Sequence, residues 1–141
     1  SYISRDVVTK NAHLIDKYKV RISILVPQNG EAGVKPEKGY RSMSTPHLVY
    51  PGQVDSFSYL NIGFFDNETE AENFRKYMMC KLPRFMMRTT YSSAHISQSN
   101  FIFVPKMDYT RSWTDPELYE HFGLSDEEIK LVETTMRPMA E

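Results

Sequence analysis

Four residues with chemically useful side chains recur along one predicted helix. Tyr77, Lys81, Arg84 and Arg88 are spaced at i, i+4, i+7 and i+11, so on a helix they lie along one edge and project the same way. The three cations of this stripe, Lys81, Arg84 and Arg88, predict contacts with the phosphates of a nucleic acid. The helix is also acidic at its start and basic at its end, which suits the helix dipole, so an ordinary surface helix is the competing interpretation.

Polar residues on two loops complete the candidate nucleic-acid interface. Tyr40 and Arg41 lie in a long glycine-containing loop, 28–44, which is basic toward its end. Ser97, Gln98 and Asn100 offer hydroxyl and amide groups of the kind that read base edges in a DNA groove. The predicted DNA-contacting residues are Lys81, Arg84, Arg88, Tyr40, Arg41, Gln98 and Asn100.

Catalytic and metal-binding patterns are weak in this sequence. The residues 128–130 (EIK) match the letters of a metal-dependent nuclease motif, but we expect them in the first turn of a helix and not at a strand edge. The histidines share no ligand spacing, and the glycine-rich turn of an adenosylmethionine or dinucleotide site is lacking. Cys80 stands beside Lys81, which favours a lowered thiol pKa, although an unreactive thiol is the simpler expectation. We therefore expect no catalytic residue, metal or cofactor in this chain.

The elements that must position these residues read as strand, helix, strand. Residues 57–65 are rich in aromatic and β-branched types and predict a strand. Asn67 marks the start of a helix over about 67–88, in which Pro83 predicts a kink or a new helix. Residues 101–104 read as a short buried strand. We therefore expect a β-α-β unit, parallel if its strands are neighbours.

The flanking segments add one strand and two short helices. Residues 18–26 alternate between apolar and polar types, which predicts a half-buried strand. Two capping boxes, at 114–117 and 125–128, start short C-terminal helices that meet at Gly123, a left-handed C-cap. The second helix opens with acids, which disfavours a DNA-reading helix-turn-helix. The expected fold is α+β, with a small mixed sheet around the β-α-β core and two short C-terminal helices, in a single domain over 1–141.

Composition excludes several classes of protein. The chain has 141 residues, 40% of them hydrophobic and 25% charged, as in ordinary single domains, and no apolar run is long enough to cross a bilayer. A single cysteine and the lack of a secretory leader favour a cytoplasmic protein, and the initial Ser1 suggests a fragment of a larger one. The net charge of −1 is low for a free-standing nucleic-acid binder, so such a role requires a local basic patch or the remainder of the protein.

Several stretches of the chain are similar to one known family. Near the C-terminus they are 103–109 (FVPKMDY), 113–119 (WTDPELY), 122–129 (FGLSDEEI) and 137–139 (RPM), and the likeness extends to 65–74, 81–85 and 13–20. Together they resemble the C-terminal region of bacterial type II restriction-modification adenine-specific DNA methyltransferases, including those fused to restriction endonucleases. The resemblance implies a target-recognition region that follows the catalytic domain, with S-adenosylmethionine bound elsewhere in the parent protein. Residues 54–57 depart from the family pattern.

The leading hypothesis is therefore a DNA target-recognition domain that is non-catalytic alone and shares double-stranded DNA with the methyltransferase catalytic domain of the same parent chain. Three phosphate contacts from the helix stripe predict a salt slope of about −2.7, or roughly forty-fold weaker binding at 200 mM than at 50 mM salt. One alternative is a protein-docking module between methyltransferase and nuclease parts, with Met78, Met79, Met86 and Met87 as its exposed apolar patch. Another is a cryptic restriction nuclease that uses Glu128.

Overall fold

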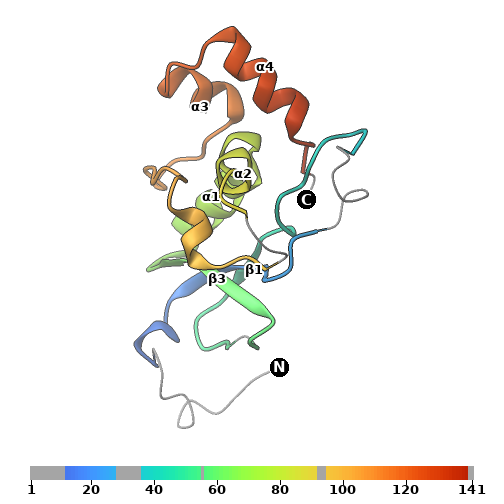
Figure 1. The fold of residues 1–141 in the computed structure, drawn as a ribbon. Coiled ribbons are helices and arrows are strands. Elements are labelled where there is room, and N and C mark those ends of the chain that lie inside the picture. The colour runs from blue at the N-terminus through green and yellow to red at the C-terminus, as the bar shows by residue number, and fades with distance from the viewer. Residues whose placement is uncertain (1–11, 28–35, 55, 92–94, 140–141) are drawn as a thin grey trace.

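Strands and helices are mixed along the chain in this computed structural model, which describes residues 12–27, 36–54, 56–91 and 95–139 (Figure 1). The α+β class and the two short C-terminal helices are confirmed. In chain order the elements are the 3-10 helix η2 (Ala12–Leu14), β1 (Tyr18–Ser23), β2 (His47–Val49), β3 (Tyr59–Phe65), α1 (Glu68–Met79), α2 (Lys81–Arg88), the 3-10 helix η3 (Gln98–Phe101), α3 (Asp115–His121) and α4 (Asp126–Thr135).

The strands form one antiparallel sheet in the order β2-β1-β3, with β1 in the centre. Val20 and Ile22 of β1 are buried, as the alternation of this segment predicts. Across the sheet Arg21 lies opposite His47 of β2. The guanidinium of Arg21 also lies over the ring of Tyr59 on β3, 4.3 Å from its centroid. Polar side chains from all three strands are therefore neighbours.

The predicted β-α-β unit is wrong, because residues 101–104 form no strand. The backbone N–H of Ser97 donates a hydrogen bond to Oδ1 of Asn100, and this local cap starts η3 instead. Ile102 and Phe103 follow η3 on the surface, where their exposed fractions are 72% and 57%. The apolar composition of this stretch thus reflects an exposed apolar surface and not sheet pairing.

The predicted kinked helix is confirmed as two successive helices. The side chain of Asn67 accepts a hydrogen bond from the N–H of Glu70 at 2.9 Å, which starts α1. The chain turns extended at Cys80, with ψ at 156°, before α2 begins. Pro83 lies in the first turn of α2, where its missing N–H costs no helical hydrogen bond. The carboxylate of Asp115, from α3, accepts from the first two N–H groups of α2 at 2.9 and 3.1 Å.

The core lies between the sheet and α1. The apolar stripe of α1 buries Ala71, Phe74 and Met78 in one cluster with Val20 and Ile22 of β1. Figure 1 shows α3 and α4 packed against α2, on the far side of the helices from the sheet. Among the helices that the structure describes, none has the length and apolar character needed to cross a membrane.

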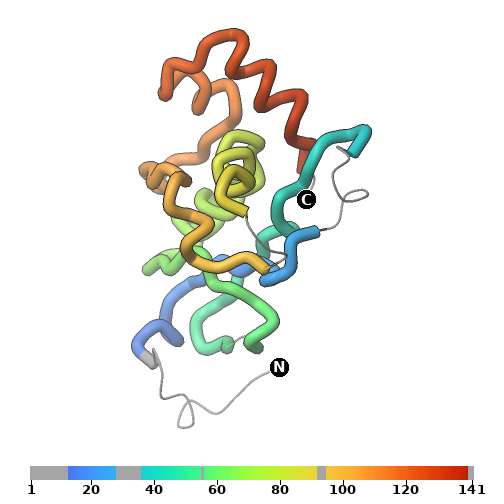
Figure 2. Tube along the Cα trace, viewed as in Figure 1, coloured from blue at the N-terminus to red at the C-terminus, as the bar shows by residue number. Residues whose placement is uncertain are grey.

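The segment 36–45 runs alongside the end of α4 (Figure 2). The N–H of Tyr40 donates to the carbonyl of Thr135 at 2.8 Å, and the carbonyl of Tyr40 accepts from the N–H of Arg137 at 2.9 Å. Gly39 has a φ of +89°, and a Cβ at this position would lie 2.9 Å from backbone atoms of Thr135 and Arg137. Only glycine allows the backbone to come this close to the end of α4. The residues after Gly39 consequently lie beside α2.

Candidate nucleic-acid interface

Two of the predicted DNA-contacting residues lie in direct contact. The guanidinium of Arg88, at the end of α2, lies 3.6 Å from the centroid of the Tyr40 ring. This cation–π contact orients Arg88, while hydrogen bonds on both sides hold the backbone of Tyr40. Arg88 is half-buried, so the pair forms part of the surface. It presents an oriented cation next to an aromatic ring.

Arg84 was predicted to lie on the exposed stripe, and this prediction is wrong. Its side chain is fully buried, and its guanidinium donates to four backbone carbonyls. Nε bonds to the carbonyls of Met79 and Cys80, both at 3.1 Å, while Nη1 and Nη2 reach those of Arg41 at 3.1 Å and Arg137 at 2.8 Å. Burial lowers the pKa of Arg84 to about 10. The residue therefore ties three segments together inside the protein and is not presented at its surface.

The rest of the stripe is also largely occupied by the protein itself. Lys81 forms an ion pair with Glu133 of α4, and its side chain is mostly covered. Tyr77 is buried, and its hydroxyl donates to the carbonyl of Pro105 at 2.7 Å. Of the four stripe residues, Arg88 thus has the side chain best placed for an external ligand. The competing interpretation, an ordinary surface helix, is also wrong for this stripe, because the side chains of Tyr77 and Arg84 are buried in the protein.

Of the two predicted DNA-contacting residues in η3, Asn100 is buried and Gln98 is exposed. Asn100 is buried, and its amide nitrogen donates to the carbonyl and to the hydroxyl of Thr90 at 3.2 and 3.0 Å. The amide oxygen of Asn100 accepts from the N–H of Ser97, and its bonds to Thr90 attach η3 to the end of α2. The side chain of Asn100 is therefore not presented for groove reading. Gln98 is exposed, so its amide remains available to a ligand.

Arg41 lies on a cavity of about 450 Å³, and the titratable side chains among its described lining residues include two arginines and a histidine. No carboxylate occurs among the described residues that line it. Nη2 of Arg41 donates to Oγ1 of Thr45 at 3.0 Å, which orients the guanidinium. We refer to this site as the basic cavity, and its lining comprises Arg21, Arg41, His47, Ser23, Ser44, Thr45, Tyr59, Ile22 and Pro27.

The backbone next to Arg41 is held in an unusual conformation. Ser42 is buried and has a φ of +71°, in the left-handed region that non-glycine residues rarely adopt. Its carbonyl accepts a hydrogen bond from the hydroxyl of Tyr91, while the carbonyl of Arg41 accepts from Arg84. The backbone thus faces the interior at this point, and the side chain of Arg41 lines the cavity.

Arg21, His47 and Tyr59 line the basic cavity, although they were not predicted as site residues. The alternation of 18–26 places Arg21 on the outward face of a strand, but it does not indicate which residues stand beside it. The sheet register supplies that information, because β2 and β3 flank β1 and bring His47 and Tyr59 next to Arg21.

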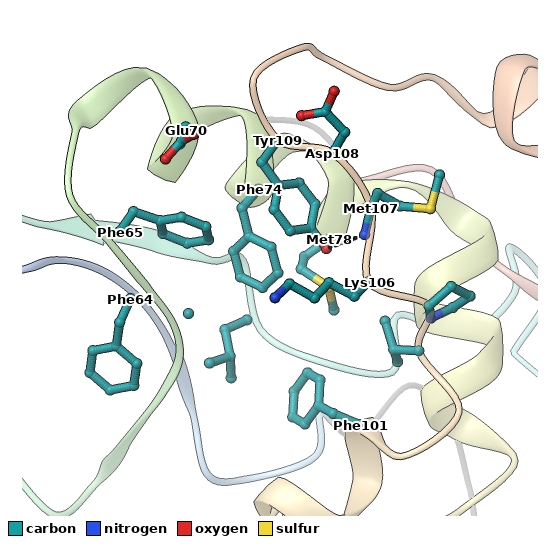
Figure 3. A pocket seen from close by; sticks show the side chains of 14 residues that line it. Phe64, Phe65, Glu70, Phe74, Met78, Phe101, Lys106, Met107, Asp108 and Tyr109 are labelled. Atoms are coloured by element: carbon teal, nitrogen blue, oxygen red, sulfur yellow. Dashed lines mark hydrogen bonds between the residues drawn. The ribbon is translucent and has the colours of Figure 1, made fainter.

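A second cavity, of about 660 Å³, opens between β3, α1 and residues 101–109 (Figure 3). Figure 3 shows the ammonium of Lys106 extended between the rings of Phe74 and Phe101. The ring of Tyr109 packs edge-on against Phe74 at a centroid distance of 5.0 Å. We refer to this site as the aromatic cavity, and its aromatic lining comprises Phe64, Phe65, Phe74, Phe101 and Tyr109.

The predicted methionine patch is wrong. Met78, Met79 and Met87 are buried, and Met86 is half-buried. Exposed apolar side chains occur instead at Phe64, which lines the aromatic cavity, and at Ile102 and Phe103, which follow the lining residue Phe101 in the chain.

The groups considered for catalysis have structural partners. Glu128 lies in the first turn of α4, as expected, and it accepts a hydrogen bond from the N–H of Ser125, which lowers its pKa. Burial raises the pKa of the Cys80 thiol to about 12, so the alternative of a lowered pKa is wrong. In the described segments no group of three or more His, Cys, Asp or Glu side chains is arranged to hold a metal ion.

Neither a protein-family model, nor a curated protein, nor a solved structure matches this chain. The interpretation of its surfaces therefore depends on their own residues and geometry.

Proposed function

We propose that this chain is the DNA target-recognition domain of a restriction-modification DNA adenine methyltransferase and that it carries no catalytic group of its own. Double-stranded DNA is its ligand, and the methyltransferase catalytic domain of the same parent binds the duplex together with it. S-adenosylmethionine belongs to that catalytic domain. The resemblance of the C-terminal motifs supports the assignment to restriction-modification proteins.

The basic cavity is the observation that carries the proposal. Two arginines and a histidine line it without a carboxylate among the described lining residues, so it favours an anionic ligand. Arg88, stacked on Tyr40, adds a further oriented cation, and exposed Gln98 adds an amide that can reach a base edge. A chain with a net charge of −1 can bind DNA through such a local concentration of cations.

The expected binding is weak for the isolated chain. If Arg21, Arg41 and Arg88 each contact one phosphate, the slope of log affinity against log salt is about −2.7. Binding then falls roughly forty-fold between 50 and 200 mM salt. Specific recognition by DNA-binding proteins generally needs a larger interface, which the catalytic domain supplies.

The test is fluorescence anisotropy of a labelled random duplex of about 25 base pairs, titrated with the full chain at both salt concentrations. We expect Arg41→Gln and Arg88→Gln each to reduce the salt slope by about 0.9 while the fold stays intact. Lys130→Gln is the matched control, because it removes one exposed charge from α4, which is far from the sheet (Figure 1). Equal losses in all three variants, or no binding at low salt, would contradict the proposal.

A second candidate function is docking between the methyltransferase and nuclease parts of the parent protein. The aromatic cavity favours it, together with the exposed side chains of Ile102 and Phe103 next to its lining residue Phe101, because exposed apolar side chains that lie together mark interaction surfaces. Under this alternative, Phe103→Ser abolishes association with the catalytic domain in analytical ultracentrifugation, and Arg41→Gln leaves that association unchanged. If Phe103→Ser associates with the catalytic domain as the native chain does, DNA recognition alone is supported.

A further inference from the structure

We propose that the basic cavity clamps a single phosphate group of the DNA backbone, so that this cavity, and not the α2 stripe, anchors the duplex. The inference rests on the proposed function and deepens it, since it names the group of the ligand that is bound and the residues that bind it. Those residues are Arg21, Arg41, Ser23, Ser44 and Thr45.

The hydroxyl groups of the cavity are arranged as donors. Oγ of Ser44 accepts a hydrogen bond from the N–H of Ser23 at 2.8 Å, Oγ of Ser23 accepts from the N–H of Leu25 at 3.1 Å, and Oγ1 of Thr45 accepts from Arg41. None of these three hydroxyl protons is donated to another described residue. Each hydroxyl therefore retains an O–H donor for a ligand.

The arginines add charged donors in fixed orientations. Among the described residues Thr45 is the one hydrogen-bond partner of the Arg41 side chain, and the other N–H groups of the guanidinium bond to none of them. The ring of Tyr59 supports the guanidinium of Arg21 at 4.3 Å. Because the guanidinium fork matches phosphate oxygens, two arginines held in this way suit phosphate better than ammonium groups would.

These donors favour a ligand that accepts many hydrogen bonds. A backbone phosphate has this character, because its oxygens are ionised and acceptor-only. With a volume of about 450 Å³ the cavity accommodates such a group together with water. The left-handed backbone of Ser42 lies between Arg41 and the hydroxyl residues Ser44 and Thr45, and all three of these residues line the cavity.

The experiment is an NMR titration of the full chain with inorganic phosphate, at ionic strength held constant with chloride. We expect saturable shifts of the backbone amides of Ser23 and Ser44 and of the Arg41 side-chain N–H. Arg41→Gln should weaken phosphate binding at least about tenfold, because it removes a charged donor. Thr45→Val keeps the shape of the side chain and should weaken binding about three- to tenfold. Lys130→Gln should leave phosphate binding unchanged.

A second arm adds unlabelled duplex to the phosphate-saturated chain. If the duplex displaces phosphate, so that the same resonances shift again, the inference is supported. If phosphate causes no saturable shift, or if the duplex binds without shifting these resonances, the inference is overturned. In that case the proposed function still holds if the duplex binds in a salt-sensitive way through Arg88. Phosphate binding without any duplex binding overturns both, because the cavity then serves a free phosphate.

Discussion

Arg84→Met should destabilise the fold strongly, because the guanidinium that it removes bonds to four backbone carbonyls. These carbonyls belong to the junction between α1 and α2, to the segment 36–45 and to the chain after α4. Each buried carbonyl left without a donor costs about 1–3 kcal/mol, although removal of the buried charge offsets part of the total. We expect a net loss of about 3–5 kcal/mol from a total stability of roughly 7–21 kcal/mol for a chain of this length.

Thermal unfolding followed by circular dichroism measures this loss. A domain of this size loses about 2–4 °C in Tm per kcal/mol, so Arg84→Met should unfold about 6–20 °C lower. The control is Arg88→Met, which lies one turn later on α2 and removes a half-buried cation–π contact worth about 0.5–1 kcal/mol. Its Tm should fall by no more than about 4 °C, while its duplex affinity should fall. A nearly unchanged Tm for Arg84→Met, together with lost duplex binding, would show that Arg84 is an exposed DNA contact and would refute the argument.

Three further predictions concern local contacts. Asp115→Ala removes the acceptor of the first two N–H groups of α2 and should cost about 0.5–2 kcal/mol in urea unfolding, whereas Asp115→Asn should cost less. Burial raises the pKa of Cys80 to about 12, so alkylation by iodoacetamide at pH 8 should be roughly a thousand-fold slower in the folded chain than in urea. A hydrogen bond from Lys81 lowers the pKa of Glu133, so its stabilisation is present above the ordinary value of 4.5 and is lost as the pH falls below it. The free energy of unfolding should therefore fall less steeply with acid in Glu133→Gln than in the native chain, as urea titrations at several pH values will show.

The helix ends were predictable because their signals are local. Asn67, Thr114 and Ser125 each accept a hydrogen bond from an N–H three residues later, so residue type and spacing are sufficient. Gly123 adopts a φ of +63°, as the left-handed C-cap requires. The alternation in β1 likewise identified Val20 as core, since a strand with one buried face has a fixed period.

The candidate site was predictable only in part. Arg41, Arg88 and Tyr40 were predictable, because basic and aromatic residues on a loop and at a helix end are recognisable by type. Arg21 and its neighbours across the sheet were not, since strand order depends on contacts between distant segments. Lys19 shows the same limit, because it lies on the face expected to be exposed and yet is buried.

The sequence by itself determined the starts of α1, α3 and α4, a break in the helix near Pro83, the α+β class and the types of residue available for binding an anion. The tertiary structure alone decided which of those residues remain available. Arg84 and Arg88 have the same residue type and lie on one helix edge, but the segment 36–45 and the chain after α4 cover Arg84 and leave Arg88 near the surface. A local pattern specifies hydrogen bonds within a few residues, whereas burial depends on the packing of segments far apart in the chain.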